Sequence, residues 1–324
     1  LSVSCARCGG PGASDALNVL IVVMDTTRAD HCTTNGYAQP TTRRLAEFAK
    51  DAVTYTEAWS PSSWTAPAHA SLFTGLRPDR HEVDVGRRMF LDTSVPTIAS
   101  ELGAAGWRTA CFTNNELVGA DLGLARGFER WDGLFLDAAR PYPWCDATHA
   151  KALDWALGVH RAGGRFFAFV NDMEPHLPYT PPDDVAQRFL RPGTPAAAES
   201  EARAMKHPRT LVLGLGLEPF ADDVRAAVTE LYDAEIATVD AELGTLLDGM
   251  GAAGFLDRTI VVVTADHGEG LGDHGWIEHS VFLHRELLRV PLVVRVPGTL
   301  AGGRADASVV RLEDVAPTVL EACG

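Results

Sequence analysis

The chain has 324 residues, of which 46% are apolar and 22% charged, and its formal net charge is −15. A chain of this length and composition buries a large core, and it has no apolar run long enough to span a bilayer. The excess of acid argues against a protein that binds nucleic-acid phosphates, because that class carries basic patches. An anionic ligand would need a locally positive site, for which a metal ion is the natural device.

Residues 1–16 predict a flexible N-terminal tail. Its first five residues fit the end of an export signal, and the run of glycine and proline at 9–12 is typical of a tether. We therefore expect a periplasmic or secreted protein, with a cytoplasmic one as the alternative. Cys5 and Cys8 have the spacing of a metal or redox pair but lack a second half, so an incidental pair is expected.

Strand and helix patterns alternate through the rest of the chain. Apolar β-branched runs predict buried strands, and apolar residues at helical spacing predict the helices between them. This alternation predicts one α/β domain over 17–324, with a mostly parallel central sheet and helices on both faces. Residues 191–216, rich in proline, alanine, glycine and charge, predict a surface insertion. The expected strands are 18–24, 108–113, 166–170, 260–264 and 292–296, and the expected helices are 40–52, 94–105, 148–159, 218–250 and 312–322.

Metal-ligand residue types follow two of these strands. Asp25 comes directly after the first strand, and Asp266 and His267 come just after the strand at 260–264. In open α/β sheets, ligands bind beyond the carboxyl ends of parallel strands. We therefore expect Asp25, Asp266 and His267 to meet at one edge and to bind a divalent cation. Their donor atoms suit Zn, Mn, Ca or Mg.

The segment SWTAPAHASLFTG at 63–75 resembles the nucleophile segment of the sulfatase branch of the alkaline phosphatase superfamily. In that family the nucleophile begins a helix within a pattern C/S/T-x-P-x-R/H-x-S-x-x-T-G, and Thr65 occupies this position. A helix N-terminus stabilises a bound oxyanion. A threonine hydroxyl is a poor nucleophile until metal coordination lowers its pKa. The resemblance therefore implies that Thr65 is both the nucleophile and a fourth metal ligand, in a chain with an alkaline phosphatase/sulfatase-like fold.

Further segments match the same family in the same order, at 25–30, 174–179, 266–269, 272–275, 289–292 and 316–318. The resemblance implies that His176 hydrogen-bonds the substrate or protonates the leaving group. It implies that His69 and His279 orient the nucleophile and hold anionic oxygens, although each could instead be a packing histidine. Arg28 and Asn114 are predicted to bind the substrate.

Departures from the family pattern bear on the substrate. Dedicated sulfatases oxidise a Cys or Ser to formylglycine and carry an Arg four residues later, whereas this chain has Thr65 and His69. Thr26 stands where the family has a second acid, Glu278 replaces a lysine, and 112–115 replaces a Gly-Lys-Trp-His segment. Each lost cation removes a partner for a sulfate oxygen. We therefore predict a hydrolase of phosphoesters, a phosphodiester or phosphonate monoester, with sulfate esters as secondary substrates.

Three alternatives stay open: a sulfate-ester hydrolase that uses unmodified Thr65, an envelope transferase of phosphoethanolamine or phosphoglycerol groups, and a non-catalytic binding module. Asp172 and His176 also have the spacing of a pair that holds a second metal ion. The Pro-His-x-Pro-Tyr context favours one ion. The expected partner is a small anionic ester rather than nucleic acid or a membrane, and the sequence predicts no oligomeric state.

Overall fold

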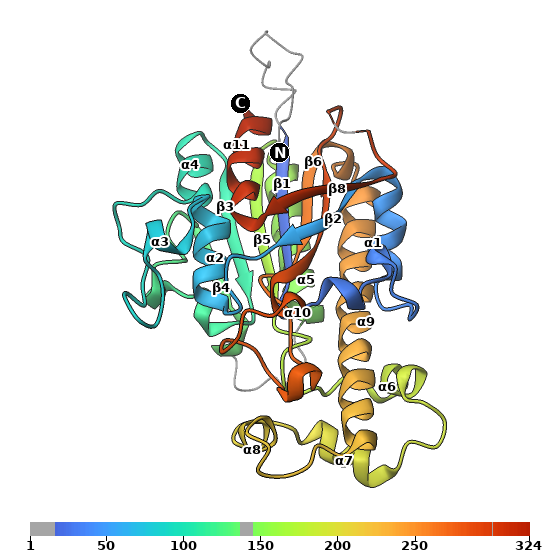
Figure 1. Cartoon of the computed structure of the whole chain (residues 1–324). Coiled ribbons are helices and arrows are strands. Elements are labelled where there is room, and N and C mark those ends of the chain that lie inside the picture. Colours follow the sequence, from blue (N-terminus) through green and yellow to red (C-terminus); the bar gives the residue numbers. More distant parts are fainter. Residues whose placement is uncertain (1–16, 137–144, 300) are drawn as a thin grey trace.

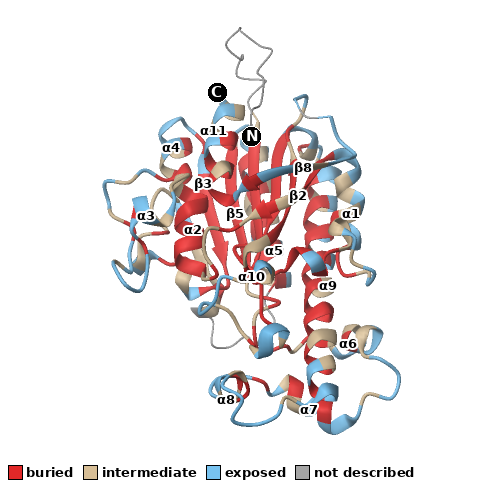
Figure 2. Cartoon of the chain, in the orientation of Figure 1, coloured by how far each residue is buried: buried red, intermediate tan, exposed pale blue. Residues whose placement is uncertain are grey.

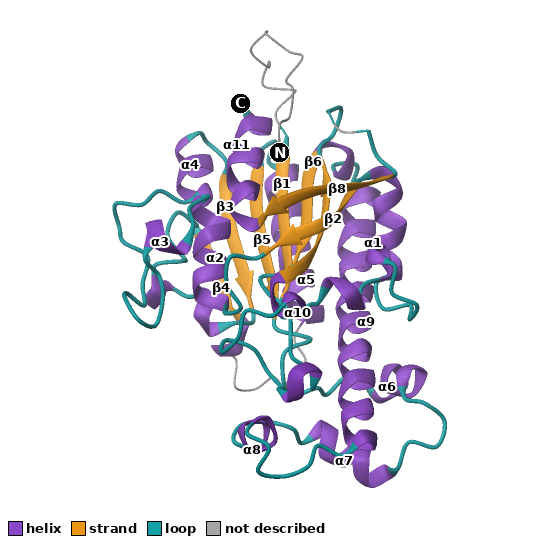
Figure 3. Ribbon diagram, in the orientation of Figure 1, coloured by secondary structure: helices purple, strands orange, loops and turns teal. Residues whose placement is uncertain are grey.

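The computed structural model describes residues 17–136, 145–299 and 301–324. The predicted tail at 1–16 therefore lies outside the described residues. The described chain is built on an eight-stranded sheet in the order β4-β3-β5-β1-β6-β7-β2-β8 (Figure 3). The strands are β1 (Asn18–Met24), β2 (Val53–Trp59), β3 (Arg108–Thr113), β4 (Arg130–Gly133), β5 (Phe166–Asp172), β6 (Thr259–Thr264), β7 (Arg289–Arg295) and β8 (Arg304–Arg311).

The sheet is mostly parallel, which confirms the predicted fold class. Strands β4, β3, β5, β1 and β6 all pair in parallel, whereas β7 pairs antiparallel with both β6 and β2. The sequence analysis did not predict strands β2, β4 and β8. Strand β8 is exposed along most of its length, so it has no continuous apolar run by which to recognise it.

Helices cover both faces of the sheet (Figure 1). Alternate residues of β1 face opposite sides, as expected for a strand. Leu20 and Val22 join the apolar cluster that contains α5 and α9 residues, while Val19 and Ile21 join the cluster that contains α2, α4 and α11 residues. The helices are α1 (Arg43–Phe48), α2 (Thr65–Thr74), α3 (Pro78–His81), α4 (Ile98–Ala104), α5 (Cys145–Arg161), α6 (Asp183–Phe189), α7 (Ala196–Arg203), α8 (Arg209–Gly214), α9 (Asp222–Ala252), α10 (Arg285–Leu288) and α11 (Val315–Cys323).

Burial follows these layers. The strands in the middle of the sheet and the helix stripes that face them are buried, and the outer helix surfaces are exposed (Figure 2). In the described part of the chain, no helix has both the length and the apolarity that crossing a bilayer requires.

The segment predicted as a surface insertion, 191–216, forms helices α7 and α8. The buried Ala198 and Ala202 lie on α7, which packs against the part of α9 that extends past the carboxyl edge of the sheet (Figure 1). The carboxylate of Glu278, in the loop after β6, accepts a hydrogen bond from Thr210 Oγ1 at 2.9 Å. The insertion therefore reaches back to a loop at the edge where ligands were expected.

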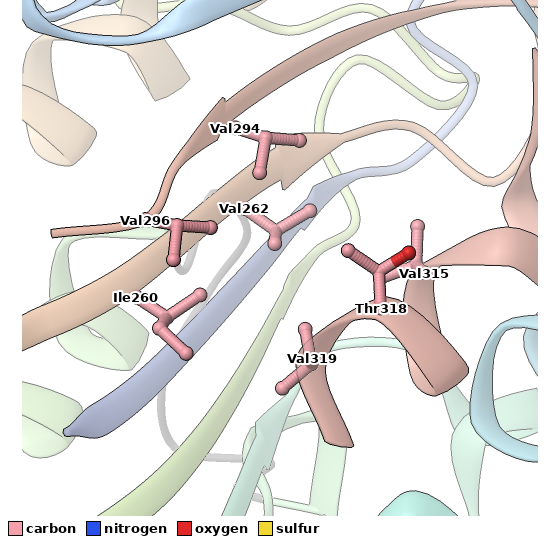
Figure 4. Close-up of a pocket in the computed structure, with 7 residues that line it drawn as sticks. All are labelled: Ile260, Val262, Val294, Val296, Val315, Thr318 and Val319. Carbon is pink, nitrogen blue, oxygen red and sulfur yellow. The ribbon is translucent and has the colours of Figure 1, made fainter. Parts of the chain in front are cut away.

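A small apolar pocket lies between the sheet and α11. Figure 4 shows side chains from β6, the end of β7 and α11 turned toward one another there. The hydroxyl of Thr318 donates to the carbonyl of Asp314, so it is satisfied within its own helix turn. Because its lining is otherwise only valine and isoleucine, this pocket offers no group for chemistry. Its lining residues are Ile260, Val262, Val294, Val296, Val315, Thr318 and Val319.

His81 connects α3 to α2 as a neutral ring. Its Nδ1 accepts from the backbone N–H of Val83 at 3.0 Å, which leaves Nε2 to donate to Ser71 Oγ at 2.9 Å. Protonation of Nδ1 would set two N–H groups against each other and break the hydrogen bond from Val83, so the charged ring is disfavoured. Burial accordingly lowers the pKa of His81 from 6.5 to about 4.

We expect His81 to contribute to acid unfolding. Between pH 6.5 and about 4 the unfolded chain binds a proton at this ring and the folded chain does not. The free energy of unfolding therefore falls as the pH falls through this window, by up to about 3 kcal/mol from this residue. His81→Gln removes the titration, so urea unfolding at pH 7 and pH 4.5 should differ less in the variant than in the wild type. Equal pH dependence in the two proteins would contradict this assignment.

Candidate functional site

Asp25 is fully buried at the end of β1, beside the end of β5. Its backbone N–H donates to the carbonyl of Asp172 at 3.0 Å, and its Oδ2 accepts from Asn115 Nδ2 at 2.6 Å. Its Oδ1 is buried without a hydrogen-bond partner among the described residues. Burial, with the nearby carboxylate of Asp266, raises the pKa of Asp25 well above its usual value.

Asp266 is held against the β1 turn. Its Oδ1 accepts from the backbone N–H of Thr26 at 3.2 Å and from that of His267 at 2.9 Å, while the buried Oδ2 has no hydrogen-bond partner in the described chain. Burial acts to raise the pKa of Asp266, but the nearby rings of His267 and His69 outweigh it and hold this pKa below its ordinary value.

The ring of His267 is oriented toward these carboxylates. The hydrogen bond from Nδ1 to the carbonyl of Gly268, 2.9 Å long, assigns the proton to Nδ1 and leaves the lone pair on Nε2. That Nε2 lies 3.3 Å from Asp266 Oδ2 and 3.4 Å from Thr65 Oγ1. Burial lowers the pKa of His267, which favours the neutral ring that a metal ion requires.

These side chains form a candidate metal centre. Ligand atoms of Asp25, Asp266 and His267 all lie within 4.8 Å of one another. Two buried carboxylate oxygens without hydrogen bonds are costly unless a cation lies between them. The donor set, two carboxylates and one imidazole, fits a divalent ion, and Thr65 adds a hydroxyl oxygen beside it.

Thr65 is the first residue of α2 and is buried, with 1% of its surface exposed. Trp64 before it is extended, so the backbone enters the helix at Thr65. The first amides of a helix are not bonded within it and attract anions. The structure therefore brings together all four residues predicted as metal ligands, and it places an anion-binding helix end next to them.

His69 lies behind Thr65. Its Nδ1 donates to the Thr65 carbonyl at 3.0 Å, and its ring contacts Phe73 and Phe169 edge-on. Its Nδ1 is also 3.6 Å from Asp266 Oδ2. Its observed contacts are those of a packing histidine that positions the nucleophile, and contact with an anionic oxygen stays a prediction.

Three histidine rings lie in a row from the centre outward. The ring of His279 lies 4.4 Å from that of His267 and 4.9 Å from that of His176. The carboxylate of the buried Glu269 lies 3.1 Å from His279 Nδ1, and the Nδ1 of His176 bonds the carbonyl of Leu177 at 2.8 Å. Burial lowers the pKa of His279 to about 4 and also lowers that of His176.

Two residues predicted to bind substrate have other partners. The guanidinium of Arg28 pairs with Asp30 at 2.8 Å and with Asp273 at 2.6 Å, so it fastens two loops together. The Oδ1 of Asn114 accepts from Thr148 Oγ1 at 2.9 Å, toward α5. The geometry thus gives Arg28 and Asn114 structural contacts, and substrate binding by either residue stays a prediction.

Asn115 is the residue that sequence reasoning missed. Successive side chains after a strand point to opposite sides, and here the second asparagine reaches Asp25 while the first faces α5. Asp172, named with His176 as the alternative pair for a second metal ion, pairs with His149 at 2.8 Å. Neither Asp172 nor His176 is a member of the two groups of three ligands in the described chain, and a second ion stays an alternative prediction.

The sulfatase family model matches residues 17–324. The chain belongs to the sulfatase family. It is 27% identical to an ulvan-active sulfatase of Formosa agariphila over 87% of this chain and 56% of that protein, and 23% identical to an arylsulfatase of Clostridium perfringens over 94% and 74%. The chain thus spans about half the length of the first of these relatives.

A solved structure shares the fold. The phosphonate monoester hydrolase of Agrobacterium radiobacter aligns with a TM-score of 0.77 and 22% identity, over 95% of this chain and 74% of that one. This likeness confirms the predicted alkaline phosphatase/sulfatase-like architecture, and at this identity it supports the fold alone.

Asn115 should tune metal affinity through Asp25. We expect Asn115→Ala to weaken binding of a divalent ion about 10–100-fold, because Asp25 loses the amide that orients it. Asn114→Ala is the matched control, since its amide oxygen bonds Thr148. Calorimetric titration of metal-free protein measures both. Equal affinities in the two variants would show that Asn115 does not support the site.

Proposed function

We propose that this chain is a metal-dependent hydrolase of phosphoesters that acts through a covalent intermediate on Thr65. The observation that carries the proposal is the position of Thr65 Oγ1. It lies at a helix N-terminus, 3.4 Å from His267 Nε2, beside the buried Asp25 and Asp266. Phosphoryl transfer needs a nucleophilic hydroxyl, a cation site and a group of anion-binding amides close together, and the start of α2 offers all three.

Asp25, Asp266 and His267 would hold the divalent ion, which supplies charge that favours the alkoxide form of Thr65 and neutralises the substrate. Thr65 gives up its hydroxyl proton to water, and its Oγ1 forms the new bond to phosphorus as the bond to the leaving alkoxide breaks. The free amides at the start of α2 bind the non-bridging oxygens. Water then attacks the Thr65 ester and regenerates the hydroxyl.

His176 is the group proposed to serve the leaving oxygen. Its Nδ1–H donates to the Leu177 carbonyl, which orients the ring, and Nε2 is the nitrogen proposed to meet the substrate. Burial lowers the pKa of His176 in the free protein. A bound anionic ester opposes that shift, because an opposite charge favours the protonated ring. The ring can then donate its Nε2 proton to the leaving alkoxide.

The site favours substrates with a single negative charge. Burial keeps the pKa of His279 at about 4, so this ring is neutral near pH 7. Glu278 stands where the family resemblance predicts a lysine, and it binds Thr210 instead. Phosphodiesters and phosphonate monoesters carry one charge at neutral pH. We therefore propose them ahead of phosphate monoesters, which carry nearly two.

Sulfate esters are the second candidate, because they also carry one charge and because the chain belongs to the sulfatase family. Thr65 cannot be oxidised to formylglycine, so such an enzyme would use the hydroxyl itself. Rates on aryl phosphodiesters, phosphonates, phosphate monoesters and sulfates, measured side by side, decide between the two. Fastest turnover of sulfates would overturn the substrate order and leave the role of Thr65 standing.

Thr65→Ala should lower kcat about a thousandfold or more, because it removes the hydroxyl that bonds phosphorus. Thr65→Ser should keep a measurable rate. Thr74→Ala is the matched control at the other end of α2, where the hydroxyl bonds the carbonyl of Ala70. Steady-state kinetics on an aryl phosphodiester measures all three, and wild-type rates in Thr65→Ala would show the nucleophile to be wrong. A wild-type protein that binds metal and stays inert on every ester would support the binding module.

A further inference from the structure

A second group of metal-ligand side chains lies outside the candidate centre, on the loop between β6 and β7. His274 stands in the short turn Asp273–Gly275, His284 immediately precedes α10, and Glu286 lies within α10. Ligand atoms of these three residues all lie within 4.8 Å of one another. We call this group the rim cluster. The proposed reaction uses none of its members.

The geometry of the rim cluster suits a small transition-metal ion. His274 Nε2 lies 3.1 Å from Glu286 Oε1, and the rings of His274 and His284 are stacked with centroids 4.0 Å apart and 18° between their planes. Zinc binds imidazole nitrogen and carboxylate oxygen at about 2.0–2.2 Å, which puts neighbouring ligands roughly 3.3 Å apart in a tetrahedron. The lone pairs of the two stacked rings lie in nearly parallel planes, so the rings would have to rotate relative to each other for all three donors to meet at one ion.

The ligands are held in place by their surroundings. The backbone of His274 has φ +50, a left-handed conformation that is uncommon for residues other than glycine. Asp273 beside it is fixed by the ion pair with Arg28. On the other side, the ring of Phe282 packs on His284 at 5.3 Å and against Trp276 at 5.3 Å. Orientation by such outer contacts is what metal ligands require.

The charges around the cluster also favour a cation. Only 14% of the Glu286 side chain is exposed, and in the described chain this carboxylate pairs with His274. The pair neutralises the charge of Glu286 only when the His274 ring is protonated. The adjacent Arg285 is directed away, to Glu57 at 3.2 Å and over the ring of Trp59. A divalent ion would supply the positive counter-charge that the Glu286 carboxylate lacks.

We propose that His274, His284 and Glu286 form a second metal site that binds a zinc-like divalent ion, with water as a further ligand. Two imidazoles and one carboxylate select zinc or a neighbouring transition metal over Mg or Ca, which prefer all-oxygen sites. The ion would join residues 274 and 284, the two ends of the loop that carries His279. It would therefore brace that loop without touching the reacting atoms.

Cobalt(II) binding to the full chain, stripped of metal, tests the proposal apart from catalysis. Asp266→Asn removes a ligand of the candidate centre and leaves the rim cluster intact. We expect Asp266→Asn to bind about one equivalent of cobalt(II) with the visible absorption of a four- or five-coordinate ion, and that band to vanish when His284→Ala is added. In the wild-type background, His284→Ala should bind about one equivalent fewer than the unmodified chain.

His274→Asn provides a second variant, because asparagine tolerates the left-handed backbone and is a poor zinc ligand. It should lose the same equivalent. His160→Ala, a histidine of α5 that packs against Phe255, is the matched control and should lose none. The rim site would be overturned if the Asp266→Asn variant bound no cobalt(II). It would also be overturned if that variant still bound one equivalent of cobalt(II) after His284→Ala was added. A wild-type chain with only the rim equivalent would instead count against the metal centre of the proposed function.

Discussion

Two carboxylates buried side by side are the constraint on which the site depends. Asp25 and Asp266 are fully buried, and each keeps one oxygen without a hydrogen-bond partner in the described chain. Burying one unpaired charge is costly, and a second like charge within a few ångströms adds repulsion. Burial raises the pKa of Asp25 as a direct result. A cation between the two would remove both penalties, which is the physical argument for a metal site at this edge of the sheet.

The fold holds that arrangement through backbone contacts that leave little freedom. Thr26 adopts φ +54, and the hydroxyl of Tyr232 on α9 both donates to the Thr26 carbonyl and accepts from the Arg28 N–H, each at 2.8 Å. After β6, a Cβ at Gly268 would lie 1.9 Å from the Glu286 carbonyl oxygen. The long helix and α10 thus fix the two turns that carry the ligands. Stability and site geometry depend on the same contacts.

Much of this could be predicted from the sequence, because buried parallel strands are continuous apolar runs and their carboxyl ends meet. That reasoning predicts that Asp25, Asp266 and His267 meet at one edge of the sheet. It could not give the direction of β7, since an apolar run carries no sign of its partner's orientation. It assigned no role to Asn115, which contacts Asp25, because the side on which each of two adjacent residues lies depends on where the strand ends. Contacts such as Asp172 with His149 join distant segments and leave no local pattern.

The loop from β6 to β7 carries one of the departures from the family pattern. Glu278, in the position where the resemblance predicts a lysine, turns to the insertion and lies within hydrogen-bond reach of both Thr210 and His207. The exchange removes a cation from the pocket and adds a tether to α8. Under the proposed function, a site with one fewer cation would favour a singly charged ester over a doubly charged one. The insertion is thereby joined to the loop that carries His279, whose ring lies 4.4 Å from that of His267.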